Sequence, residues 1–236
     1  MASKGLKLSG IFAIRGFRLE GVVIDAMHCV DLGCAMHIIG NILHEMVKMR
    51  SLGRNMGIAM QTLWEMLRVY YTTLSRTTSR LQSLSLEDIR RRGKSPKLSA
   101  KTAQTRHLAG FALELAQKYN SGNDHDNFRQ ECAQALVDFH NFLETRPRSL
   151  NAEDLAELAD IGRRICSTYA ALNRTATGNE WKLTPKFPLL LHLVELQAPL
   201  WGNPKFFWCY SDEDMVGAIC FQHQLCSCLR TWQIGF

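Results

Sequence analysis

Apolar residues recur at three- and four-residue intervals along most of the chain, which is the pattern of amphipathic helices. The pattern predicts helices over residues 31–49, 59–74, 108–119, 124–143 and 151–172. Polar residues suited to helix starts stand at Asp31, Asp124 and Asn151. Shorter helices are expected to begin at Ser85 and near Thr184, and a last one at Ser211. The chain is therefore predicted to be mainly α.

Two stretches depart from the helical period. Residues 10–24 are rich in β-branched and aromatic side chains punctuated by glycine, which favours one or two short strands. Residues 75–99 lose the apolar period apart from the short helix at Ser85, which predicts an exposed loop or hinge. The predicted fold class is thus mainly α with a small β element, α+β.

The composition is that of one soluble globular unit, with 236 residues, 46% apolar and 21% charged. Apolar runs fall short of the roughly 18 residues that span a bilayer, and Met1–Gly5 does not open a secretory signal. We expect a nuclear or cytoplasmic protein that is not secreted and has no membrane partner. The eight cysteines are expected to be reduced and mostly buried.

The net charge of +6 is concentrated in one segment. Between residues 90 and 106 the chain has no acid and seven basic residues, Arg90, Arg91, Arg92, Lys94, Lys97, Lys101 and Arg106. Such a segment is typical of phosphate contacts with nucleic acid, but a nuclear-import signal or a solvated surface would have the same composition. Duplex DNA is therefore one expected partner, and these seven residues are the candidate nucleic-acid-binding set.

Three further segments lie toward the two ends of the chain. They read Asp25-Ala26-Met27-His28, then Pro185-Lys186-Phe187-Pro188-Leu189-Leu190-Leu191-His192, then Tyr210-Ser211-Asp212-Glu213-Asp214-Met215-Val216-Gly217. These segments resemble the Asp-x-x-His motif, the Pro-Lys-x-His-x-x-x-His segment and the final catalytic stretch of DNA transposases of the CACTA (En/Spm) type. Pro188 stands where the family has its first histidine.

The resemblance implies a C-terminal part of a transposase catalytic domain. Residues 1–50 and 180–236 would form the remnant of an RNase H-like core, interrupted by a helical insertion over residues 51–179. Glu213 matches the last catalytic carboxylate, and Asp25 and His28 would be vestigial active-site neighbours. The ancestral activity would use Mg²⁺ or Mn²⁺ held by carboxylates such as Glu213 and Asp25, whereas this chain lacks a complete carboxylate set and would need no cofactor.

Simpler interpretations of the same residues remain open. Glu213 would favourably meet a helix dipole without any metal. Asp25 would serve as a helix cap hydrogen-bonded to His28, an arrangement compatible with an active-site position. Asp31 is expected to be a helix cap.

Two other function classes remain. Donors crowd into residues 25–37, at Asp25, His28, Cys29, Cys34 and His37, which would suit a small zinc-stabilised domain if His28, Cys34 and His37 met at one point. The chain could instead be a helical interaction or structural module without a nucleic-acid role, with a protein partner or a second copy of itself. No Walker-type glycine loop and no Gly-x-Ser-x-Gly motif is present, so nucleotide hydrolysis and acyl transfer are not supported.

Overall fold

The computed structural model describes residues 14–15, 18, 21–49 and 52–210 of the chain. Regular structure in these residues is entirely helical, so the mainly α class is confirmed. The α-helices are α1 (Met36–Lys48), α2 (Met56–Thr73), α3 (Leu86–Ile89), α4 (Thr102–Lys118), α5 (Asp124–Thr145), α6 (Ala152–Thr175), α7 (Lys186–His192) and α8 (Ala198–Trp201). Two π-helical segments, Met27–Ala35 and Leu193–Gln197, lead into α1 and α8, and a 3₁₀ turn spans Pro204–Phe207.

Side-chain caps fix several of the helix starts. Asn151 accepts the amide of Asp154 at 2.8 Å, and Asp154 accepts the amide of Asn151 at 3.2 Å, so the predicted cap at Asn151 is confirmed as a capping box. Ser85 and Asp88 form the same reciprocal arrangement at α3. The start of α5 is capped by Asn123, whose Oδ1 accepts the amide of Asp126, one residue before the predicted Asp124.

Two predictions near the N-terminus are wrong. Residues 14, 15, 18 and 21–24, the described part of the predicted strands, contain no strand, and the rest of residues 10–20 lies outside the described residues. A side chain, not a neighbouring strand, binds the backbone here: the Ile24 amide donates a hydrogen bond to Gln197 Oε1 at 2.7 Å. Asp31 does not cap a helix, because it lies inside the π-helical segment and is buried. The predicted last helix from Ser211 lies outside the described residues.

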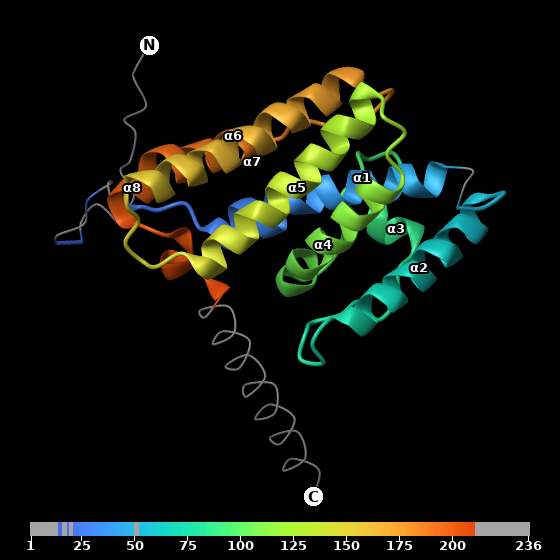
Figure 1. The fold of residues 1–236 in the computed structure, drawn as a ribbon, viewed down its shortest axis with the longest axis horizontal. Coiled ribbons are helices and arrows are strands. Elements are labelled where there is room, and N and C mark those ends of the chain that lie inside the picture. The colour runs from blue at the N-terminus through green and yellow to red at the C-terminus, as the bar shows by residue number, and fades with distance from the viewer. Residues whose placement is uncertain (1–13, 16–17, 19–20, 50–51, 211–236) are drawn as a thin grey trace, which may run out of the picture.

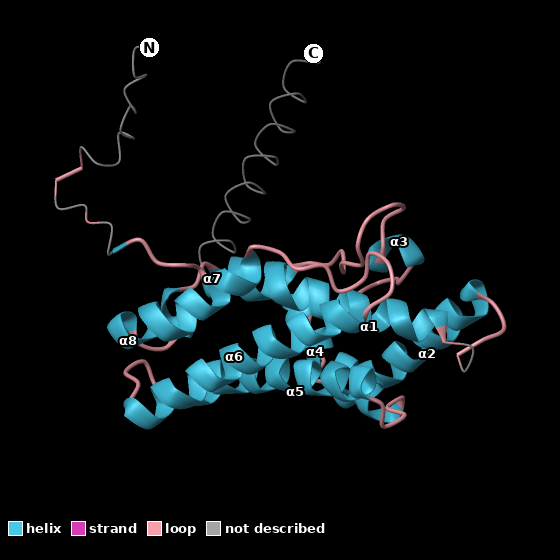
Figure 2. Ribbon diagram, turned by 90° about the horizontal axis from the view of Figure 1, so that it is seen from above, coloured by secondary structure: helices cyan, strands magenta, loops and turns pink. Residues whose placement is uncertain are grey.

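The described helices form two layers. Figure 2 shows α7, α8 and α1 along one side and α4, α5 and α6 along the other, while α2 lies at one end. α5 packs along both α4 and α6, and α1 contacts α2, α4 and α5 (Figure 1). Within the described residues no helix is both long enough and apolar enough to cross a membrane.

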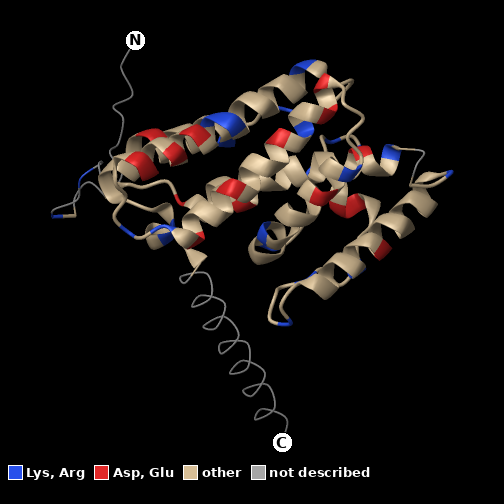
Figure 3. Ribbon diagram, viewed as in Figure 1, with Lys and Arg blue, Asp and Glu red and all other residues tan. Residues whose placement is uncertain are grey.

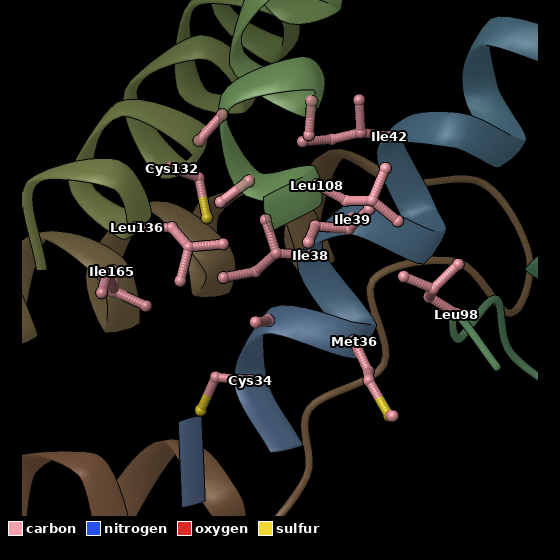
Figure 4. Packing of buried hydrophobic residues seen from close by; sticks show 14 of the residues in the cluster. Cys34, Met36, Ile38, Ile39, Ile42, Leu98, Leu108, Cys132, Leu136 and Ile165 are labelled. Carbon is pink, nitrogen blue, oxygen red and sulfur yellow. The ribbon is translucent and has the colours of Figure 1, made fainter. Parts of the chain in front are cut away.

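The core is one continuous cluster centred on α1. Ile38, Ile39 and Ile42 are fully buried and point toward residues of α4 and α5, including Leu108 and Leu136 (Figure 4). Each such side chain contributes about 1.5–3 kcal/mol of burial free energy. The cluster takes residues from both the expected transposase-like core and the expected insertion, residues 51–179, whose division stays a prediction.

On its other side α1 is met by an irregular segment, residues 96–98. Leu98 donates its amide to the Met36 carbonyl at 2.9 Å, and Pro96 and Leu98 are both buried. The approach is possible because residue 40 is glycine: a Cβ there would lie 2.5 Å from the Leu98 nitrogen and 2.7 Å from the Lys97 Cα. The predicted loop over residues 75–99 is therefore largely irregular, but it is attached to the core at this point.

Replacing Gly40 with alanine should separate this segment from α1. The new methyl group meets the backbone of Lys97 and Leu98, so we expect Gly40→Ala to lower the free energy of unfolding by about 1–3 kcal/mol. Gly57→Ala is the matched control in α2, where the nearest atom to a Cβ is Asn55 Oδ1 at 3.4 Å, and it should stabilise by about 0.4–1 kcal/mol. Urea denaturation of both variants measures the difference. Equal effects would contradict the close approach.

Candidate functional sites

Asp25 ends an extended stretch and caps the π-helical segment that follows it. Its Oδ2 accepts the His28 amide at 2.9 Å, and its Oδ1 accepts the Met27 amide at 3.3 Å. His28 Nδ1 lies 2.5 Å from the same Oδ2. A third amide arrives from the other end of the described chain, because the Cys209 N–H donates to Oδ1 at 2.8 Å. The interpretation of Asp25 as a helix cap bonded to His28 is therefore confirmed.

These hydrogen bonds keep the carboxylate charged. Partial burial alone would raise the pKa of Asp25, but the hydrogen bonds from the His28 amide and ring, and then from the Cys209 and Met27 amides, together lower that pKa below its usual value. Asp25 is thus a charged carboxylate that joins the start of the π-helical segment, at Met27 and His28, to the distant Cys209.

The site residues expected from the transposase resemblance are brought together in part. Asp25 and His28 touch, whereas Glu213 lies outside the described residues. The neighbourhood of Asp25 does not fit Mg²⁺ or Mn²⁺ in the described part of the chain: the two other donors beside it are an imidazole nitrogen and a thiol, while these ions prefer oxygen.

The zinc ligand set predicted from the sequence is not assembled. Cys34 is fully buried in the core, and His37 lies at the surface of α1 against Pro96 and Lys97. Among the described residues, Asp25, His28 and Cys209 are the group whose three ligand atoms lie within 4.8 Å of one another. Cys209 escaped the sequence analysis because it lies 184 positions from Asp25, and no local spacing connects the two.

Asp31 forms a second buried cluster that sequence reasoning missed. His140 Nε2 lies 2.7 Å from its Oδ1, and the Tyr210 hydroxyl donates to its Oδ2 at 2.8 Å. Burial and then the Asp31 charge raise the pKa of Tyr210 well above its usual value, so the hydroxyl stays a donor. The partners lie 109 and 179 residues from Asp31, and this cluster joins the first π-helical segment to α5 and to the last described residue.

Removing the Asp31 carboxylate should be costly, because it would leave the buried His140 ring and the half-buried Tyr210 hydroxyl without their acceptor. We expect Asp31→Ala to lower the free energy of unfolding by about 3 kcal/mol or more. Asp160→Ala is the control, since Asp160 is an exposed aspartate of α6 and its removal should change stability by less than about 0.5 kcal/mol. Chemical denaturation distinguishes them, and a small effect at Asp31 would show that water replaces the carboxylate there.

The seven basic candidates divide into two groups. Arg90 and Arg106 are engaged within the protein: Arg90 donates to the Lys94 carbonyl and contacts His44, while Arg106 pairs with Glu144 at 2.5 Å and stacks on Trp208. The other five side chains are exposed, namely Arg91, Arg92, Lys94, Lys97 and Lys101. By contrast, α6 carries both signs of charge, with its acidic residues in its first half and its basic residues after them (Figure 3).

Three of these exposed residues, Arg91, Lys94 and Lys97, line a pocket of about 650 Å³, and Arg92 and Lys101 are close to them in sequence. Its wall is formed by the start of α1, residues 91–100 and residues 179–184. Four of the lining residues are cationic, Arg91, Lys94, Lys97 and Lys182, and none of the described residues that line it is acidic. We call Arg91, Arg92, Lys94, Lys97, Lys101 and Lys182 the basic rim.

Three polar atoms in the wall of this pocket are buried without a hydrogen-bond partner in the protein. They are His37 Nδ1, Ser95 Oγ and Thr184 Oγ1. Burial, and then the neighbouring Lys97, lower the pKa of His37 to about 4, so its ring is neutral at physiological pH. Buried polar atoms normally have a hydrogen-bond partner, so these three atoms are suited to bind water or a ligand in the pocket. The pocket can bind an anion, and none of its lining residues forms a nucleophile–base pair.

The chain matches no protein-family model, no curated protein and no solved structure.

Proposed function

We propose that this chain is a transposase-derived, DNA-associated protein that binds the phosphate backbone through its basic rim and lacks a complete set of catalytic carboxylates. The observation that carries the proposal is the convergence of the exposed cations on one pocket that no described acid lines. Phosphate contacts by Lys and Arg supply most of the affinity of non-specific DNA binding. Such contacts position a protein on DNA without reading its sequence.

The geometry of the segment favours binding because little conformational freedom would be lost. Lys97 and Ser99 donate their amides to the carbonyls of Ile89 and Asp88 at 2.9 and 2.6 Å, in addition to the contact of Leu98 with Met36. Irregular chain that is already fixed loses less conformational entropy when a partner binds. On the far side of the rim, Glu87 and Asp88 border Arg91 and Arg92 in a smaller hollow, and the Asp88 carboxylate is used by Ser85. The pocket side of the rim is therefore the proposed phosphate-facing side.

The transposase-derived origin, with a remnant RNase H-like core, is supported by the proximity of the described parts of the three motif segments. The Cys29 thiol donates to the Lys186 carbonyl at 3.6 Å, so the first segment packs against the second. A Cβ on Gly33 would lie 3.0 Å from the Lys186 side chain. The third segment begins at Tyr210, whose hydroxyl reaches Asp31. The first two segments thus lie together, and Tyr210, the one described residue of the third, lies beside them.

A helical interaction module is the second candidate. Exposed apolar side chains lie in α8 and just before it in the sequence: Leu196, Leu200 and Trp201 are 58%, 72% and 45% exposed. Side chains of this kind are enriched at protein interfaces. This candidate requires no affinity for DNA, so the DNA-binding measurement separates the two.

Salt dependence of binding tests the proposal. If the rim engages about four phosphates, the logarithm of the affinity for duplex DNA should fall against the logarithm of salt concentration with a slope near about −3.6. Replacing Arg91, Arg92, Lys94 and Lys97 by alanine should flatten the slope and weaken binding to all sequences alike. Fluorescence anisotropy with two unrelated duplexes at several salt concentrations gives both quantities.

The control removes the same charge from elsewhere. Arg54, Arg68, Arg76 and Arg174 are exposed and lie outside the pocket wall, so their joint replacement by alanine should leave the slope close to that of the original chain. An equal loss in both variants would attribute binding to net charge alone. Absence of binding at about 50 mM salt would favour the interaction module.

We also expect the purified chain not to nick or join DNA with Mg²⁺ or Mn²⁺. A two-metal reaction needs several carboxylates around the ions, and Asp25 is the described carboxylate at a motif position. A supercoiled-plasmid assay checks this. Nicking that requires divalent metal and disappears in Glu213→Gln would contradict the expectation.

A further inference from the structure

Asp25, His28 and Cys209 bring an oxygen, a nitrogen and a sulfur donor to one place. Their ligand atoms lie within 4.8 Å of one another. The Asp25 side chain is 16% exposed and that of His28 is 47% exposed, so the cluster is open enough for an ion to enter from solvent. The donors come from positions far apart in the chain, and the backbone amide of Cys209 fixes its position by donating to Asp25 Oδ1.

The donor atoms need only small shifts to reach the spacing of a tetrahedral zinc site, since one pair is 2.5 Å apart and all three lie within 4.8 Å. Zinc binds sulfur at about 2.3 Å and nitrogen or oxygen at about 2.0–2.2 Å, which places neighbouring donor atoms roughly 3.3–3.6 Å apart. Nδ1 of His28 and Oδ2 of Asp25 are hydrogen-bonded at 2.5 Å. A cation bound by both atoms needs them to separate by about 1 Å.

The donor set discriminates among metals. Mg²⁺ and Ca²⁺ take oxygen ligands, whereas a thiolate with an imidazole and a carboxylate suits Zn²⁺. Oδ1 of Asp25 would keep its hydrogen bonds from the Met27 and Cys209 amides while Oδ2 coordinates. Hydrogen bonds of that kind orient a ligating carboxylate.

We propose that Asp25, His28 and Cys209 bind one Zn²⁺ with water in the fourth position. Binding releases the thiol proton of Cys209, and the Nδ1 hydrogen of His28 moves to Nε2 by exchange with solvent, so that a carboxylate, a neutral imidazole and a thiolate carry the ion. The ion would join residue 209 to residue 25 and so fasten the segment after α8 to the start of the first π-helical segment. This proposal is independent of DNA binding.

Cobalt titration of the full chain tests it. After removal of metal with a chelator, Co²⁺ should give the visible absorption of a tetrahedral site together with a thiolate charge-transfer band, saturating at about one ion per chain, and Zn²⁺ should displace it. Cys209→Ser should abolish the charge-transfer band, and His28→Gln should weaken binding at least about 100-fold. Circular dichroism confirms that both variants remain folded.

Cys166→Ser is the matched control. The Cys166 thiol donates to the Phe187 carbonyl at 3.4 Å, and burial raises its pKa to about 12, so it is a poor source of thiolate. This variant should bind cobalt as the original chain does. The proposal is overturned if the original chain binds no stoichiometric Co²⁺, if Cys209→Ser retains the band, or if Cys166→Ser loses it as well.

Discussion

Burial of α1 on all sides is the constraint on which the rest of the structure depends. Ten of its 13 residues are buried, including the polar side chains of Asn41 and His44. A polar group in such a position must find a partner inside the protein, since an unsatisfied one costs about 1–3 kcal/mol. The chain meets this demand with segments that have no regular structure, and their positions follow from the helix.

Asn41 and Glu45 show how this works. Asn41 donates to the Pro96 carbonyl at 3.4 Å and accepts the amide of Trp181 at 2.7 Å. Glu45 accepts the indole N–H of Trp181 at 2.5 Å and pairs with the buried Arg129 of α5. Trp181 is fully buried at a φ of 53°, a backbone region that side chains other than glycine rarely adopt. The two hydrogen bonds to α1 hold it there.

Interactions with polar residues of α1 also position the basic segment. Glu180 is 8% exposed and pairs with Lys48 at 2.6 Å, with the Arg90 guanidinium 3.9 Å away. Arg90 also contacts His44, and burial followed by the Arg90 charge lowers the pKa of His44 to about 4, which keeps that ring neutral. These contacts hold the Arg90 side chain against α1 and Glu180, and the basic residues that follow it are exposed to solvent.

Local pattern was sufficient for the helices, whereas partners distant in sequence decided everything that it missed. Periodicity predicted α2, α4, α5 and α6 because one face of each is apolar. Asp31 has the local sequence pattern of a helix cap. The helix nevertheless begins six residues earlier, at Asp25, and the Asp31 carboxylate is hydrogen-bonded to His140.

The candidate sites follow the same division. The sequence located the basic segment and the pair Asp25 and His28, since each lies within one short stretch. It could not show that Arg90 and Arg106 are engaged inside, because their acidic neighbours Glu180 and Glu144 are remote in sequence. The pocket was equally invisible, as three separate stretches form its wall.

Attachment of residues 96–98 to α1 gives the basic rim its fixed geometry, and amide hydrogen exchange measures that attachment directly. The amide of Leu98, which donates to Met36, should exchange as slowly as amides inside α1, while the amide in the exposed turn at Gly93 exchanges quickly. Exchange at Leu98 as fast as at Gly93 would contradict a preformed rim.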